Sequence, residues 1–122
     1  MSQSASQARS FYRDVAKQKS VWGIRDDKGI PAPLGDNGKR AMPFWSTRSR
    51  AEKVVSTVDA YKGFEIFELS WQEFRDKWLI GLDKDGLSVG VNWSGSRATG
   101  YDVEPLNVKE LVEYELNKQT GT

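Results

Sequence analysis

Hydrophobic residues recur with the period of an α-helix in four segments of the chain. In residues 4–18, for example, Phe11 and Val15 fall on one face of such a helix. Ser49 and Ser70 are each followed three residues later by glutamate, the capping-box signature of a helix start. The pattern therefore predicts helices over residues 4–18, from about residue 49, from residue 70 to about 84, and from about residue 107.

Five shorter stretches have the composition of β-strands. They are SVWGIRD (20–26), GIPAPL (29–34), RAMPFW (40–45), GFEIFEL (63–69) and LSVGVNWS (87–94). The Asp26–Gly29 turn predicts that the first two pair as a hairpin. Pro31 and Pro33 have no N–H to donate, so the second strand is predicted at a sheet edge or is cut short. In the last stretch apolar and polar residues alternate, so Trp93 is predicted to face the core.

The order of these elements predicts an α+β fold. Strands joined by short turns pair antiparallel, whereas strands joined through helices can pair in parallel. We expect a single mixed or mainly antiparallel sheet of about five short strands with about four helices packed on it. A chain of 122 residues is close to the commonest domain size, so residues 1–122 are expected to form one domain.

Charge is nearly balanced over the chain but uneven along it. The net charge of +1 disfavours nucleic-acid binding through overall charge, without excluding it. Residues 39–53 hold five basic residues and one acidic residue, a net charge of +4, and residues 102–115 hold five acidic and one basic, a net charge of −4. The two segments either face each other, are solvated, or provide a patch for a ligand.

The N-terminal residues are polar and charged where a secretory signal needs an apolar core. We find no apolar run long enough to span a bilayer. These observations lead us to expect a cytoplasmic protein with no membrane partner.

The sequence contains no cysteine and no histidine. Their absence excludes a catalytic thiolate, a disulfide, a Cys/His zinc site, an imidazole base and a Ser-His-Asp triad within this chain. Carboxylates remain for acid-base or metal-assisted chemistry, but their spacing does not demand a metal. We therefore favour a protein that is not an enzyme and has no catalytic residue, cofactor or metal site, and keep a carboxylate or metal-assisted enzyme as the last choice.

The run GSRATG, from Gly95 to Gly100, has the two-glycine spacing of a phosphate-binding loop and follows a predicted strand. A true P-loop continues with lysine and then serine or threonine, whereas Tyr101 and Asp102 stand here. The turn amides and Arg97 remain able to hold a phosphate or carboxylate. The simpler interpretation is that the glycines adopt positive backbone angles while Arg97 pairs with Asp102 or Glu104.

The run FWSTRSR offers a second place for an anion. Ser46 lies at a predicted helix start, where free amides attract anions, and Arg48 and Arg50 can add hydrogen bonds. With Arg25 and Arg40, these residues predict an arginine-lined site that also includes Gly95 and Arg97. The alternative is that the hydroxyls merely cap the helix and the arginines are solvated or neutralised by acidic side chains.

Four blocks of the sequence together resemble a known family. They are VWGIRDDKGIPAP, RAMPFWSTRSRAEKV, GFEIFELSW and DGLSVGVNWSGSRATGYDVEP. In order and content they are similar to the small bacterial family catalogued as domain of unknown function 2750, from about Ala5 to about Tyr114. The resemblance implies a stand-alone bacterial cytoplasmic protein and implies no reaction, ligand or functional residue.

Three functions follow in order of preference from these observations. The first is a non-catalytic cytoplasmic module that binds a protein partner, such as an adaptor or a neutralising protein. The second is binding of an anion, a nucleotide or nucleic acid, which requires the arginines to converge on one face. The third is the carboxylate or metal-assisted enzyme, which requires at least two acidic side chains in one pocket.

Overall fold

The computed structural model describes residues 3–35 and 37–120 of the chain. In these residues the helices are α1 (Gln3–Gln18), α2 (Arg48–Thr57), η1 (Asp59–Tyr61), α3 (Trp71–Glu73), the π-helical turn η2 (Phe74–Trp78), α4 (Leu79–Lys84) and α5 (Pro105–Thr120). The strands are β1 (Ser20–Arg25), β2 (Ala41–Phe44), β3 (Glu65–Ser70), β4 (Ser88–Ser94) and β5 (Thr99–Val103). The prediction of an α+β fold is confirmed.

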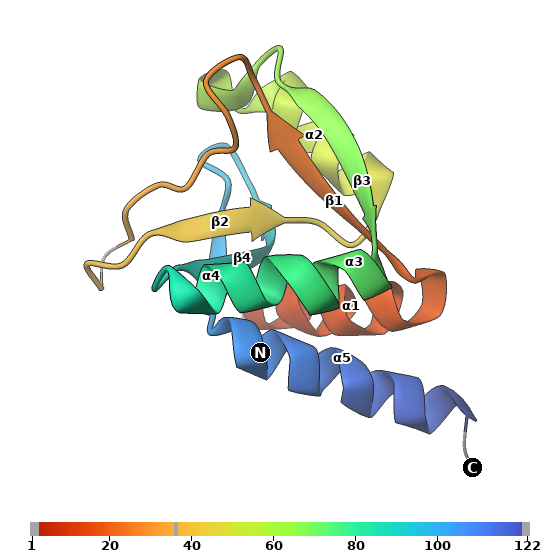
Figure 1. Cartoon of the computed structure of the whole chain (residues 1–122). Coiled ribbons are helices and arrows are strands. Elements are labelled where there is room, and N and C mark those ends of the chain that lie inside the picture. Colours follow the sequence, from red (N-terminus) through yellow and green to blue (C-terminus); the bar gives the residue numbers. More distant parts are fainter. Residues whose placement is uncertain (1–2, 36, 121–122) are drawn as a thin grey trace.

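The strands form two small sheets, so the prediction of a single sheet is wrong (Figure 1). β1 pairs antiparallel with β3. In the other sheet β4 lies centrally, parallel to β2 and antiparallel to β5. An isolated bridge between Trp22 and Trp45 joins the sheets, with both backbone N···O distances at 2.8 Å. Pairing stops there because two residues later Thr47 already caps α2.

Two helix starts show how local chemistry sets the boundaries. The Ser70 hydroxyl accepts the N–H of Glu73 at 3.0 Å, so the predicted cap of the third helix is confirmed. The second helix begins earlier than predicted, because Thr47 rather than Ser49 is the cap and accepts the N–H of Arg50 at 3.3 Å.

Two strand predictions differ from the structure. Residues 30–34 form no strand beyond an isolated bridge of Leu34 to Arg40, because Pro31 and Pro33 lack the N–H that a ladder requires. The Asp26–Gly29 turn does form, but the strand that precedes it pairs with β3 instead. The other difference is the strand β5, which directly follows the turn at residues 95–98. The sequence pattern predicts no strand there.

The core consists of two clusters of buried side chains. The larger cluster takes its side chains from α1, the helical segment from α3 to α4, α5, the β2–β4 pair and the β1–β3 pair. Figure 1 shows these helices packed beside the strands. The smaller one lies under α2 and contains Ile24, Trp45, Val54 and Trp93. Trp93 is therefore in the core, as predicted, and it also reaches the cleft described below. None of the described helices combines the length and apolar character needed to cross a membrane.

Candidate functional site

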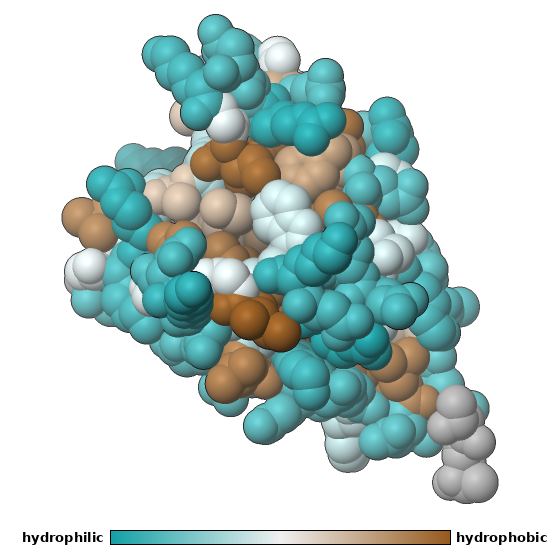
Figure 2. All heavy atoms as spheres, in the orientation of Figure 1, coloured by the Kyte–Doolittle hydropathy of each residue, from teal (hydrophilic) through white to brown (hydrophobic). Residues whose placement is uncertain are grey.

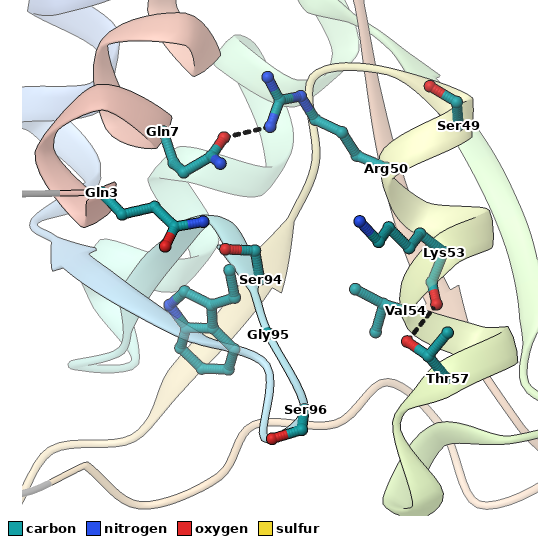
Figure 3. A pocket seen from close by; sticks show the side chains of 11 residues that line it. Gln3, Gln7, Ser49, Arg50, Lys53, Val54, Thr57, Ser94, Gly95 and Ser96 are labelled. Carbon is teal, nitrogen blue, oxygen red and sulfur yellow. Dashed lines mark hydrogen bonds between the residues drawn. The ribbon is translucent and has the colours of Figure 1, made fainter.

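A cleft of about 610 Å³ opens between the first turns of α1, one face of α2 and the turn that joins β4 to β5 (Figure 3). Its lining is made of polar, basic and a few apolar residues: Gln3, Gln7, Ser49, Arg50, Lys53, Val54, Thr57, Trp93, Ser94, Gly95 and Ser96. None of these eleven described residues is acidic. The cleft therefore has the character of a site for a negatively charged molecule.

Trp93 forms an apolar part of the cleft wall, and two glycines make room for its ring. A Cβ atom on Gly90 would lie 2.3 Å from that ring, and one on Gly100 would lie 2.9 Å from it. The indole N–H is directed to the Tyr101 carbonyl at 3.3 Å and to the Asp102 carboxylate at 3.1 Å. The ring is thus fixed by β5, the strand that the sequence did not predict.

A buried polar network supports the cleft from below. Asn92 is 1% exposed and Ser46 is 0% exposed. The side-chain oxygen Oδ1 of Asn92 accepts a hydrogen bond from the Ser46 backbone N–H at 2.9 Å. The side-chain nitrogen Nδ2 of Asn92 donates to the backbone carbonyl of Gln7 at 3.1 Å. The Ser46 hydroxyl donates to Asp14 at 2.9 Å. These bonds tie α1, β4 and the start of α2 together, so the three walls of the cleft have fixed relative positions.

Two cations reach the cleft from α2, and they differ in their partners. The Arg50 guanidinium donates to the Gln7 side chain and lies 3.9 Å from the Asp14 carboxylate, so its charge is partly compensated. Lys53 points from α2 into the gap facing the Ser94–Ser96 turn (Figure 3). Its ammonium has no ion-pair partner among the residues that the structure describes. Of the two cations in this cleft, Lys53 is therefore the one whose charge is available to a ligand.

The structure does not bring all the predicted arginines together. Arg25 pairs with Glu65 at 2.8 Å and lies over the Phe67 ring. Arg40 donates to the Ala32 carbonyl at 2.9 Å. Arg48 forms a 3.6 Å contact with Glu52 and lies over the Trp22 ring. These three arginines are not among the residues that line the cleft.

Three of the other predicted site residues do lie in or beside the cleft. Arg50 and Gly95 line it, and Arg97 lines an adjoining hollow. Gly95 has a φ of +87°, which only glycine adopts without strain. Ser46 is the buried network residue described above, so its hydroxyl faces Asp14 and Asn92. The hydrogen bonds and ion pairs of the described residues include none between Arg97 and Asp102 or Glu104, whereas Gly95 has the positive φ that the simpler interpretation expected.

Sequence reasoning missed Lys53, Gln7 and Asn92. Nothing local separates Lys53 from the other basic residues, because its availability depends on which carboxylates lie near it in space. Asn92 did give a signal, since it is an amide in the middle of a buried strand. That residue has a φ of +51° beside an irregularity in the β4–β5 pairing, a conformation that asparagine tolerates better than most residues.

The acidic residues do not build an obvious reaction centre. Asp26, Asp27 and Glu65 border a hollow of about 450 Å³ at the end of β1. Glu65 is paired with Arg25, and Asp26 accepts the Lys28 N–H at 2.9 Å as part of its turn. Within residues 3–35 and 37–120 no group of three acidic side chains is arranged to hold a metal ion.

Comparison with known proteins gives one match. A family model described as protein of unknown function (DUF2750) matches residues 8–111, which is most of the chain. No curated protein and no solved structure matches the sequence. The resemblance seen in the four sequence blocks is therefore confirmed.

Proposed function

Because the chain belongs to the DUF2750 family, whose description assigns no activity, we propose its function from the cleft: non-catalytic binding of a small organic anion. The observation that carries the proposal is Lys53, an ammonium without an ion-pair partner among the described residues, which faces a cleft with no acidic lining residue. An anion placed there gains a charge-assisted hydrogen bond, and such bonds are stronger than neutral ones.

The remaining lining fits the same class of ligand. Gln3, Ser94 and Ser96 offer amide and hydroxyl groups for an anion's oxygens. Val54 and Trp93 offer apolar contact for a short carbon skeleton. Apolar walls with a few placed polar groups are typical of small-molecule sites.

The sequence-based preference for a protein partner has weaker support and stays a prediction. α5 exposes Leu106, Leu111 and Tyr114, with the last 60% exposed. On the face drawn in Figure 2, however, hydrophobic residues form separate groups among hydrophilic ones. Small, separate groups of exposed hydrophobic residues fall short of the large contiguous patch that marks a protein interface, so they do not outweigh the cleft.

The proposal predicts a ligand-dependent rise in melting temperature that requires Lys53. Acetate, propionate, butyrate, succinate, glutarate, adipate and inorganic phosphate are tested by thermal unfolding at constant ionic strength, with chloride as the reference anion. A ligand at a hundred times its Kd stabilises the native state by about 2.7 kcal/mol. For a domain of this size that free energy corresponds to a rise of several degrees.

Lys53→Gln removes the charge and is expected to abolish the rise. Lys28→Gln is the matched control, because Lys28 lies in the Asp26–Gly29 turn and does not line the cleft. If no anion in the panel raises the melting temperature of the wild type, or if both variants respond equally, the proposal is wrong.

A further inference from the structure

The cleft does not end at the β4–β5 turn. A second hollow of about 290 Å³ lies against the same turn and is lined by Gln3, Ser4, Ser94, Gly95, Ser96, Arg97 and Thr99. Four of these residues, Gln3, Ser94, Gly95 and Ser96, also line the cleft. Both spaces therefore border the same turn.

Arg97 is the cation of the second hollow, and the nearby carboxylates are already engaged. Asp102 accepts the Trp93 indole N–H at 3.1 Å, and Glu104 pairs with Lys39 at 2.8 Å. Arg97 is exposed and has no hydrogen bond or ion pair among the described residues. Within the second hollow none of the described lining residues is acidic, although Arg97 also lines a third hollow, of about 300 Å³, together with Asp102.

We propose that the ligand is an elongated dianion, held at one end by Lys53 and at the other by Arg97. This inference rests on the proposed function and narrows its ligand class. The carbon skeleton crosses the Ser94–Ser96 turn, where hydroxyl groups and the side-chain-free Gly95 line both spaces. Gly95 matters here because it gives the turn its positive φ of 87° and adds no side chain between the two hollows.

The charge balance of the lining favours two anionic groups over one. A monoanion at Lys53 leaves Arg97 without a counter-charge, whereas a dianion supplies a partner to each. An arginine also bonds a carboxylate or phosphate with two parallel N–H groups, which fixes the orientation of the far end. Dicarboxylates and phosphorylated carboxylic acids share this chemistry, and aliphatic dicarboxylates are the simplest probes of it.

The experiment is isothermal titration calorimetry with succinate, glutarate and adipate, each compared with acetate, propionate and butyrate at one ionic strength. We expect at least one dicarboxylate to bind the wild type roughly tenfold more tightly than any monocarboxylate, because its second anionic group adds a charge-assisted hydrogen bond. Arg97→Gln should reduce dicarboxylate affinity to the monocarboxylate level and leave monocarboxylate affinity unchanged. Lys53→Gln should weaken both classes.

Arg13→Gln is the matched control for Arg97→Gln, because Arg13 is an exposed arginine of α1 that lines neither hollow. Circular dichroism of each variant establishes that it is folded. If mono- and dicarboxylates bind the wild type with equal affinity, and Lys53→Gln weakens the binding of both, the proposal of a dianionic ligand is wrong and the proposed function stands. An effect of Arg13→Gln as large as that of Arg97→Gln also overturns it. Failure of every carboxylate to bind the wild type overturns the proposed function itself.

Discussion

Asn92 combines a strained backbone with a buried hydrogen-bond network. Its side chain bonds the Ser46 N–H and the Gln7 carbonyl, and its φ is +51°. Asn92→Ala leaves the buried Ser46 N–H without its acceptor and places alanine in the left-handed region. An unsatisfied buried donor costs about 1–3 kcal/mol and the backbone adds about 1–2 kcal/mol. We expect urea unfolding to show a loss of roughly 2–5 kcal/mol in the free energy of unfolding of Asn92→Ala.

Asn92→Gly separates the two causes, because glycine adopts a positive φ without strain but also lacks the side-chain acceptor. Asn92→Gly should therefore be more stable than Asn92→Ala by about 1 kcal/mol. Both should remain less stable than the wild type. Equal stability of the two variants would show that the hydrogen bonds, and not the backbone angle, account for the whole effect.

β4 owes its shape to the close approach of Trp93 and a glycine. A Cβ on Gly90 would meet three ring atoms at 2.3–2.6 Å, and Gly90 is itself buried in the middle of the strand. The ring cannot move away freely, because its N–H is held by Tyr101 and Asp102 on β5. Gly90→Ala should therefore destabilise the protein by about 2–3 kcal/mol, the cost of overpacking a core, as measured by urea unfolding followed by circular dichroism.

Gly81→Ala is the control for Gly90→Ala, since it makes the same change in a helix. Within α4, a Cβ on Gly81 would find no described heavy atom within 4 Å outside its own helix turn and chain neighbours. Alanine is favoured over glycine in a helix by about 0.8–1.0 kcal/mol, so this variant should be more stable than the wild type. If Gly81→Ala destabilised the protein as much as Gly90→Ala, the steric argument for β4 would fail.

Elements with a strong local signal could be predicted, and strand pairing could not. Ser70 and Glu73 match the capping-box signature of a helix start, and the Glu73 backbone N–H does donate to the Ser70 hydroxyl. The partner of β1 depends instead on a competition between residues 30–34 and β3. The two prolines in 30–34 cannot complete a ladder, whereas β3 offers six paired residues. The sequence of β5 lacks alternation because its residues are mostly exposed on both faces.

At the scale of the whole molecule, ion pairing between distant segments decides which basic residues remain available in the candidate site. The opposite charges of residues 39–53 and 102–115 do meet, at the 2.8 Å contact of Lys39 with Glu104. From the sequence, Arg25 and Arg50 have equal standing as predicted site residues. In the structure Arg25 pairs with Glu65 across the β1–β3 sheet, whereas Arg50 lines the cleft. Residue types therefore predicted an anion site that included Arg97, but Lys53 could be distinguished from the other basic residues only by the packing of α1, α2 and the turn.

Global stability should fall at alkaline pH because of a partly buried phenol, that of Tyr12. Tyr12 lies on α1 against the larger core cluster, and burial raises its pKa to about 12 from the ordinary 10.0. Because the pKa is higher in the folded state, the unfolded chain loses the phenol proton at a lower pH than the folded chain does. The stabilisation is therefore complete below pH 10 and is lost as the pH rises from 10 towards 12.

Tyr12→Phe removes this titration and keeps the ring, whose hydroxyl has no hydrogen bond to the described residues. The free energy of unfolding of the variant should match that of the wild type near neutral pH and fall less steeply between pH 10 and 12. Burial also raises the pKa of Tyr61, so part of the alkaline loss should persist in Tyr12→Phe and decrease further when Tyr61→Phe is added. Urea unfolding at a series of pH values measures both curves. Parallel curves for wild type and Tyr12→Phe would mean that Tyr12 ionises equally readily in the folded and unfolded chain, contrary to its position against the core.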